Sequence, residues 1–399
     1  MKLLQVNSVY GSGSTGRICA QLASAVTKAG DECLTAYGRG KPTPYGEERL
    51  LRIGSDLDVR LHGAATRLLD AHGLASRRAT KRLLAEVRSF DPDIIHLHNI
   101  HGYYLQYEVL FEALRALDRP VLWTLHDCWA FTGHCAYFDL AACERWKTGC
   151  RDCPQRRTYP ASMVLDASAR NWQRKNAAFS GLKNLTIVTP SHWLAGLVKE
   201  SFLGAYPTRV IPNGVDIALF RPQPESAVRR VLPQGIAPGR YLLGVANEWE
   251  PRKGLKDFLT LAERVKDTSL KILLVGLRED QLRALPENVC GIRRTSSAEA
   301  LAALYSGSAA YLNLTYEENY PTTNLEAAAC GAVVISYSSG GSGETLCARS
   351  RVVRTGDLDQ VEALVRQMPL SPRTDAPCPP LDAERCYARY VELYRSIMQ

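Results

Sequence analysis

Short apolar runs alternate with longer amphipathic segments along most of the 399-residue chain. This pattern is typical of βαβ units, in which buried parallel strands alternate with helices that cover the sheet. In the first half, the apolar runs predict strands at residues 2–6, 33–37, 94–99, 121–126 and 186–191. The second half repeats the plan at residues 241–247, 271–276, 309–314 and 332–337. The sequence therefore predicts the α/β fold class, with two doubly wound domains.

Turn-forming residues separate the two halves. Residues 210–225 contain the pair Asn213-Gly214 and three prolines within a short span. We therefore expect a first domain at residues 1–213 and a second at 214–380. The last amphipathic run has no strand after it to cover, so residues 381–399 are expected to form a helix that packs back on the first domain.

Composition places the chain among ordinary globular proteins, with 46% hydrophobic and 23% charged residues. No apolar run approaches the length of about 18 residues that spans a bilayer. Met1 is followed at once by a strand-like pattern rather than by a signal peptide. The sequence therefore predicts a cytoplasmic protein. Its twelve cysteines would stay reduced there, which argues against a disulfide framework.

The formal net charge of +8 is modest for this length, but residues 60–88 concentrate arginine and lysine on an amphipathic helical pattern. Such a surface can contact phosphates or anionic lipid headgroups, so a peripheral contact with the inner membrane face is one interpretation. A solvated helix face is the other. No basic stripe dominates the chain, and nucleic acid is therefore not expected as a partner.

A glycine-rich loop follows the first predicted strand. Gly11, Gly13 and Gly16 form G-x-G-x-x-G between that strand and a helix, where free N–H groups can receive a phosphate. A unit that binds NAD should carry an acid at the end of its second strand, but Gly38 and Arg39 stand there. This disfavours NAD and leaves NADP open. A purely structural tight turn is the alternative.

Histidines gather at the ends of two predicted strands, where ligands of open α/β sheets bind. His96, His98 and His101 surround the end of one strand, and His126 ends the next, directly before Asp127. Asp127 could orient the His126 ring for chemistry, although a packed histidine is the alternative. No acidic cluster accompanies His98 and His101, so a metal pair is not expected.

Cysteines are concentrated in an insertion at residues 128–153. Four of them have the spacing x7, x6 and x2, at Cys135, Cys143, Cys150 and Cys153. Four thiolates that end in a C-x-x-C pair suit the tetrahedral demand of structural zinc. Cys128 and His134 are further candidate ligands, and ordinary reduced thiols are the alternative.

Two cations begin a helix in the second half. Arg252 and Lys253 follow a predicted strand at a glycine-flanked turn, where they can neutralise a diphosphate. Exposed basic pairs are also commonly just solvated.

Two carboxylates surround another helix start. Thr322 and Thr323 lie between Glu318 and Glu326, so backbone N–H groups there can bind a phosphate. Glu326 could accept hydrogen bonds from vicinal ribose hydroxyls, and Glu318 could reach a sugar beyond the phosphates. The alternative is a capping box of Thr323 and Glu326.

These motifs together resemble the GT-B glycosyltransferases of the large retaining family 4, which use nucleotide sugars. The E-x7-E signature is matched by Glu318 and Glu326, the basic turn by residues 251–254, and the first loop by residues 11–16. Residues 124–154 are similar to transferases that build colanic acid, capsule and other bacterial surface polysaccharides. The resemblance extends over nearly the whole chain.

The resemblance implies roles for individual residues. Glu318 would contact hydroxyls of the donor hexose, Glu326 the ribose, and Lys253 with Arg252 the diphosphate leaving group. His126 would face the donor sugar near the reacting carbon. Gly13 lies on the loop that approaches the phosphates in the family.

One position departs from the family pattern. Many members carry an arginine six residues before the lysine, and here Asn247 occupies that position. The diphosphate would then be bound by one cation fewer than in those members, so Arg252 should contribute more to its binding.

The implied architecture is two Rossmann-like domains that face each other across a cleft. The implied reaction moves a hexosyl unit from a UDP- or GDP-sugar to a hydroxyl of a growing, lipid-linked oligosaccharide, with retention and no catalytic metal. The sequence leaves three other interpretations open: an NADP-dependent oxidoreductase, a nucleotide-sugar epimerase, and a zinc-dependent module that binds nucleic acid.

Overall fold

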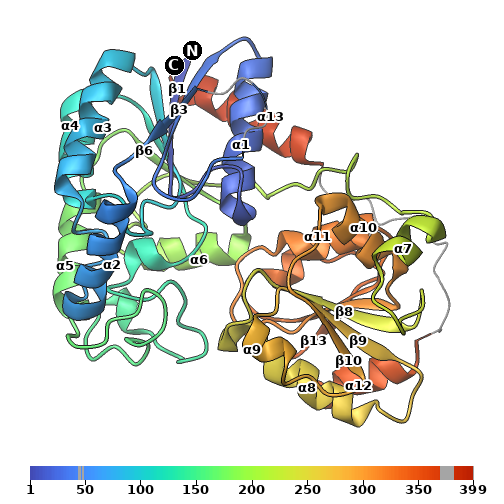
Figure 1. The fold of residues 1–399 in the computed structure, drawn as a ribbon. Coiled ribbons are helices and arrows are strands. Elements are labelled where there is room, and N and C mark those ends of the chain that lie inside the picture. The colour runs from blue at the N-terminus through green and yellow to red at the C-terminus, as the bar shows by residue number, and fades with distance from the viewer. Residues whose placement is uncertain (44–45, 47–48, 369–381, 399) are drawn as a thin grey trace. The chain divides into compact units, whose positions relative to one another are not determined.

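The computed structural model describes residues 1–43, 46, 49–368 and 382–398. The chain divides into two compact units. Unit 1 comprises residues 1–212 and 386–399, and unit 2 comprises residues 213–385. In Figure 1, the blue and green elements belong to unit 1, and the yellow and orange elements belong to unit 2.

Unit 1 is built on seven parallel strands in the order β3-β2-β1-β4-β5-β6-β7. The strands are β1 (Lys2–Asn7), β2 (Glu32–Tyr37), β3 (Arg49–Arg52), β4 (Ile94–Leu97), β5 (Val121–Thr124), β6 (Leu185–Thr189) and β7 (Thr208–Val210). The helices are α1 (Gly13–Lys28), α2 (Asp56–Leu69), α3 (Arg77–Phe90), α4 (Tyr107–Leu117), α5 (Ser168–Phe179), α6 (His192–Glu200) and α13 (Ala383–Ile397). Short 3₁₀ turns occur at η1 (Trp129–Phe131) and η2 (Arg145–Lys147).

Both faces of this sheet are covered, because side chains alternate along each strand. Leu4 and Val6 of β1 join the large core that α3, α4 and α5 cover. Gln5, between them, points to the other face and donates to the backbone oxygen of Cys19 on α1 at 3.2 Å. On that face lies α13, whose Tyr394 hydroxyl is 2.7 Å from His96 Nδ1.

Unit 2 contains six parallel strands in the order β10-β9-β8-β11-β12-β13. The strands are β8 (Tyr241–Val245), β9 (Lys271–Val275), β10 (Val289–Ile292), β11 (Ala310–Asn313), β12 (Val334–Tyr337) and β13 (Arg351–Val353). The helices are α7 (Glu225–Val231), α8 (Leu255–Arg264), α9 (Glu279–Leu282), α10 (Ala298–Gly307), α11 (Thr322–Ala329) and α12 (Leu358–Arg366), with 3₁₀ turns η3 (Pro251–Lys253) and η4 (Ser342–Thr345).

Consecutive side chains of β8 again point to opposite faces of the sheet. Leu242 packs in a core with Phe258 of α8 and Val361 of α12. Leu243 packs in a second core with Leu304 of α10 and Leu325 of α11. Buried on both faces, the central strands read as continuous apolar runs, which is why the sequence revealed them.

The predicted α/β class is confirmed, and each of the nine predicted strands is present. The sequence missed β3, β7, β10 and β13, which are the four edge strands of the two sheets. Edge strands are short and partly exposed, so they carry no continuous apolar run; β3 is buried at none of its four positions. The predicted end of the second domain, residue 380, lies outside the described residues.

Within the described part of the chain, no helix combines the length and the apolar character needed to cross a membrane.

Candidate functional site

Each sheet has one place where the strand order reverses direction. In unit 1 the reversal falls between β1 and β4, and in unit 2 between β8 and β11. Ligands of open parallel sheets bind beyond the carboxyl ends of the strands at such reversals, because the connections there diverge to opposite faces. These two places hold most of the residues that the sequence analysis singled out.

Lys253 and Glu318 form an ion pair at the reversal in unit 2. Lys253 ends η3, which follows β8, and Glu318 lies on the loop that follows β11. The distance from Lys253 Nζ to Glu318 Oε2 is 2.7 Å, and the two side chains are 21% and 14% exposed. The structure therefore brings together two residues for which the sequence predicted separate roles.

The surroundings set the pKa values of this pair. Burial by itself would raise the pKa of Glu318. The positive charges of Lys253 and Arg252 lower it, and so do hydrogen bonds from Lys253 and the Asn319 N–H. The lowering effects are larger, so the pKa of Glu318 lies below its ordinary value. Burial lowers the pKa of Lys253, and the charge of Glu318 offsets only part of this effect. Glu318 is therefore an ionised carboxylate at neutral pH.

Arg252 is fixed to the same loop as Glu318. Its Nη1 donates to the backbone oxygen of Glu317 at 3.1 Å, and its own backbone oxygen accepts from the Tyr316 N–H at 2.8 Å. Its Nε lies 3.0 Å from Glu250. Both cations of η3 are thus held against the loop after β11.

Glu326 is buried, at 3% exposure, and accepts a hydrogen bond from the Tyr305 hydroxyl at 3.2 Å. Helix α11 begins at Thr322, and its N-cap residue, Pro321, makes no side-chain capping bond. The alternative of a capping box between Thr323 and Glu326 is therefore wrong, because the N-cap position is Pro321, two residues before the position that this geometry requires. Glu326 consequently lies in the second turn of the helix, not in the first as the sequence suggested.

Asp257, in the first turn of α8, was not identifiable as a site residue from the sequence. Its Oδ2 accepts hydrogen bonds from the hydroxyls of Tyr316 and Tyr337, both at 2.7 Å. These bonds tie the start of α8 to the segment that follows β11 and to the last residue of β12, and so fix the loop that carries Glu318. An acid in the first turn of a helix was the available signal, but nothing in the sequence identified its partners.

The three glycines of the loop that follows β1 differ in their surroundings. Gly11 has a φ of +68°, and a β-carbon there would lie 2.0 Å from the Thr43 backbone oxygen. At Gly16, a β-carbon would lie 3.1 Å from Val9. A β-carbon on Gly13, where φ is +63°, would meet nothing within 4 Å. Gly11 and Gly16 therefore serve the packing of the loop, and Gly13 leaves its outer side open.

His126 lies just beyond β5, and its ring is held by His98. The distance from His126 Nε2 to His98 Nδ1 is 3.2 Å, and the rings stack with centroids 5.5 Å apart. His98 Nε2 lies 3.1 Å from Gln5 Oε1, which can only accept. His98 thus donates from Nε2 and accepts at Nδ1, so the proton between the rings belongs to His126.

The sequence suggested that Asp127 orients the His126 ring, but its carboxylate contacts other groups. Its Oδ2 lies 3.0 Å from His101 Nε2, and its Oδ1 accepts from the Trp129 N–H at 2.9 Å. Burial lowers the pKa of His126 to about 4, and the charge of Asp127 opposes this only in part. The orienting partner of the neutral His126 ring is therefore His98.

These histidines line a cavity of about 10 Å³, enough for about one water molecule. His98, His101, His126, Asp127 and Trp129 are among its lining residues.

The four cysteines singled out by their spacing line one common cavity, also of about 10 Å³. They are Cys135, Cys143, Cys150 and Cys153. A hydrogen bond from Cys135 lowers the pKa of Cys153 to about 7, and Cys150 Sγ accepts from the Gly133 N–H at 3.1 Å. Among the described residues, however, no group of three or more His, Cys, Asp or Glu side chains could hold a metal ion as arranged. Cys135 and Cys153 are hydrogen-bonded to each other in this arrangement, and Cys150 is hydrogen-bonded to the backbone.

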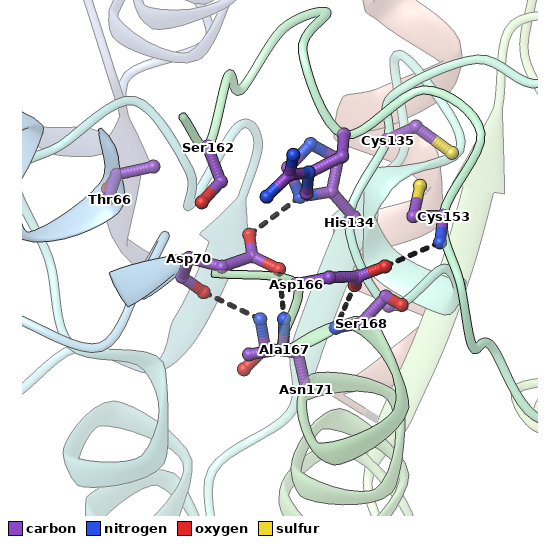
Figure 2. Close-up of polar contacts among 12 residues, drawn as sticks. Thr66, Asp70, His134, Cys135, Cys153, Ser162, Asp166, Ala167, Ser168 and Asn171 are labelled. Carbon is purple, nitrogen blue, oxygen red and sulfur yellow. Dashed lines mark hydrogen bonds and ion pairs between the residues drawn. The ribbon is translucent and has the colours of Figure 1, made fainter. Parts of the chain in front are cut away.

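His134, which the sequence offered as a spare metal ligand, is instead paired with Asp70 at the end of α2 (Figure 2). His134 Nδ1 lies 2.6 Å from Asp70 Oδ1, and both side chains are almost fully buried. Asp70 Oδ2 accepts from the Ala167 N–H at 2.9 Å, and Asn171 donates to the Asp70 backbone oxygen at 2.6 Å. This network anchors the cysteine loop to α2 and α5.

Among the cysteines that the structure describes, ten are free thiols and Cys347 is disulfide-bonded.

Comparisons with known proteins point to one family. The model of "Glycosyltransferase Family 4" matches residues 15–219, and the model of "Glycosyl transferases group 1" matches residues 233–375. A curated relative, the putative colanic acid biosynthesis glycosyl transferase WcaC of Escherichia coli K12, is 27% identical over 230 residues, which cover 55% of each chain. The chain spans between about a third and about half of the length of the curated relatives it matches.

Solved structures share the fold over the whole chain. Sucrose-phosphate synthase from Thermosynechococcus elongatus has a TM-score of 0.71 at 17% identity, with 100% of this chain and 99% of that chain covered. Anabaena HepE, solved in complex with UDP, has a TM-score of 0.67 at 14% identity, with 99% and 100% covered. The oxidoreductase and epimerase interpretations are not favoured, since both family models describe glycosyltransferases. The family 4 match across residues 15–219, with two parallel sheets of the GT-B type, shows that the chain belongs to glycosyltransferase family 4.

Proposed function

We propose that this protein transfers a hexosyl unit from a UDP- or GDP-sugar to an acceptor hydroxyl, with retention at the anomeric carbon. The observation that carries the proposal is the Lys253–Glu318 pair, 2.7 Å apart at the strand-order reversal of unit 2. A cation and a carboxylate that touch at this place suit a ligand with phosphates at one end and hydroxyls at the other.

On donor binding, Lys253 would turn from Glu318 to the diphosphate, with Arg252 beside it. Negative charge develops on the leaving diphosphate in the transition state, and cations already in place stabilise it without reorganisation. The N-terminus of α11, at Thr322 and Thr323, would add backbone N–H groups to the same phosphates.

The carboxylates would then hold the two rings of the donor. Glu318, released from Lys253, would accept hydrogen bonds from hydroxyls of the hexose. Glu326 would accept from the ribose hydroxyls, and its bond from Tyr305 supports this role by fixing the carboxylate. The phosphates themselves would assist deprotonation of the acceptor, so the proposal needs no catalytic metal.

Unit 1 would contribute His126 and the glycine loop. His126 is neutral because burial lowers its pKa to about 4, and its ring is aligned by His98. A neutral, oriented imidazole can hydrogen-bond a sugar hydroxyl without placing a second positive charge beside the anomeric carbon. Gly13 leaves room for a phosphate or sugar to approach the start of α1.

We propose a lipid-linked oligosaccharide of a bacterial surface polysaccharide as the acceptor. The similarity to a protein named for colanic acid biosynthesis supports this class of product. A peripheral contact with the inner face of the membrane would follow from such an acceptor.

The test is a panel of nucleotide sugars incubated with the purified full chain, with release of UDP or GDP as the readout. Glu318→Gln is expected to reduce release by at least about 100-fold, since it removes a charged hydrogen-bond acceptor from the sugar. Glu263→Gln, an exposed glutamate of α8, is the matched control and should behave as wild type. Equal activity of Glu318→Gln and wild type, or stabilisation by NADPH but not by UDP or GDP, would overturn the proposal.

We also propose a structural zinc ion for the cysteine loop, on the support of the C-x-x-C spacing and the shared cavity. Binding requires the thiols to close around the ion from their present positions. Elemental analysis of freshly purified protein should find about one zinc per chain. Cys150→Ser combined with Cys153→Ser should lose it, whereas Cys290→Ser, in unit 2, should not. A folded wild-type preparation without zinc contradicts the site.

A further inference from the structure

Helix α2 exposes an unusual number of large apolar side chains. Leu57, Leu61, Leu68 and Leu69 are 64%, 62%, 54% and 51% exposed. The inward face of the helix consists of only three buried residues, His62, Gly63 and Thr66. The leucines therefore contribute nothing to the core of unit 1 that could explain them.

A second exposed apolar segment runs alongside the end of this helix. Met163, Val164 and Leu165 are 55%, 58% and 45% exposed. The Met163 N–H donates to the Arg67 backbone oxygen at 2.7 Å, and the Leu165 N–H donates to the Leu68 backbone oxygen at 3.3 Å. These bonds hold the segment against the carboxyl end of α2.

We call the exposed apolar residues of α2 and of this segment the apolar ridge. They are Leu57, Leu61, Leu68, Leu69, Met163, Val164 and Leu165. Single exposed leucines are ordinary, but a contiguous group of this size on one surface marks an interaction site. Seven of the eleven exposed large apolar side chains among the described residues belong to it.

The charges around the ridge are predominantly positive. Arg60 and Arg67 are exposed on α2 among the leucines. The acids at the start of the helix are already paired, since Asp56 contacts Arg52, and Asp58 contacts Ser55 and Arg82.

Further cations lie on the exposed side of α3, which α2 contacts through the pair of Asp58 with Arg82 and through the bond between His62 and Ser76. They are Arg77, Arg78, Lys81, Arg82 and Arg88. Leucines flanked by arginines match a surface that has negative charge outside and hydrocarbon beneath.

We propose that the apolar ridge docks unit 1 on an anionic lipid bilayer, with leucines inserted below the headgroups and arginines on the lipid phosphates. The biological purpose of this membrane contact depends on the proposed transfer to a lipid-linked acceptor. The contact itself is inferred only from the exposed side chains. A second copy of the chain would cover the leucines but would not explain the cations around them.

The experiment is sedimentation of the full-length protein with vesicles. We expect binding to phosphatidylcholine vesicles that contain about 30% phosphatidylglycerol, and much weaker binding to pure phosphatidylcholine. The triple variant Leu57→Gln, Leu61→Gln, Leu68→Gln should lower the bound fraction by at least about tenfold. Its side chains are exposed, so folding should persist. Leu140→Gln, equally exposed at 53% but outside the ridge, is the matched control.

Arg60→Gln with Arg67→Gln should weaken the preference for anionic vesicles, because only the five cations of α3 then remain beside the ridge. Wild type that fails to sediment with either vesicle, or a triple variant that binds as wild type does, overturns the proposal. A dimeric wild type that becomes monomeric in the triple variant would assign the ridge to contacts between copies instead. Release of UDP or GDP without acceptor is measured in parallel. Loss of docking with that release intact separates this proposal from the proposed function.

Discussion

Lys253 and Glu318 are 65 residues apart in the chain, yet their charged atoms lie 2.7 Å apart. The sequence identified both residues, because a cation at a helix start and an acid before another helix are local signals. Their contact was not predictable, because it depends on β8 and β11 lying side by side in the sheet. The same reason explains why Asp257 was missed, since both tyrosines that define its role lie more than fifty residues away.

His126 gives a prediction for acid stability. Its pKa is about 4 in the folded protein, against 6.5 as the ordinary value. Between these two pH values the unfolded chain binds one more proton at this residue than the folded chain does. The contribution of His126 to the free energy of unfolding therefore falls as the pH falls from 6.5 to 4, by up to about 1.4 kcal/mol per pH unit.

Urea denaturation at pH values from 4 to 7 measures this effect. His126→Gln should lose stability less steeply than wild type as the pH falls. His192→Gln, which replaces an exposed histidine, is the control and should keep the wild-type slope. Parallel slopes for His126→Gln and wild type would show that His126 is not buried in its neutral form.

At the scale of elements, central strands were predictable and edge strands were not. A strand with both faces covered carries a continuous apolar run, whereas β7 has no buried residue among its three. The loops that follow the strands were predictable as loops, because glycine and proline mark them. Which side chains meet across two loops was decided by strand order.

The glycine loop gives a prediction at this scale. Gly13→Ala should reduce sugar-nucleotide turnover by at least about tenfold, because the added methyl group occupies the space in front of α1 where a ligand would approach. Gly30→Ala is a close control: Gly30 also has a positive φ, +81°, and open space around it, but it lies at the other end of α1.

Both substitutions force alanine into a left-handed conformation, so each should cost about 1 kcal/mol of stability. Equal turnover in the two variants, measured with matched thermal unfolding curves, would remove Gly13 from the site.

At the scale of the whole molecule, α13 returns the end of the chain to unit 1. Tyr390 and Tyr394 are 1% and 0% exposed, and their hydroxyls contact Thr124 at 3.3 Å and His96 at 2.7 Å. The last helix of the protein therefore packs against β4 and β5, the two strands at whose ends the histidines lie.

Tyr390→Ala is consequently expected to destabilise the protein by about 3–5 kcal/mol, through the cavity it leaves under α13. Urea denaturation followed by tryptophan fluorescence measures the change. Glu392→Ala, on the exposed side of the same helix, should change the free energy of unfolding by less than about 0.5 kcal/mol. Equal stability of the two variants would mean that α13 is not part of the core of unit 1.

The sequence by itself determined the α/β class, the nine central strands, and the residue types at the ends of those strands. These features depend on local periodicity and local turn chemistry, which are written along the chain. Only the tertiary structure decided that Glu318 pairs with Lys253, that His98 rather than Asp127 aligns His126, and that His134 bonds to Asp70. It also decided that seven apolar side chains of α2 and residues 163–165 stay exposed. Such facts depend on which segments become neighbours, and parallel strands bring together residues from distant connections that no local pattern encodes.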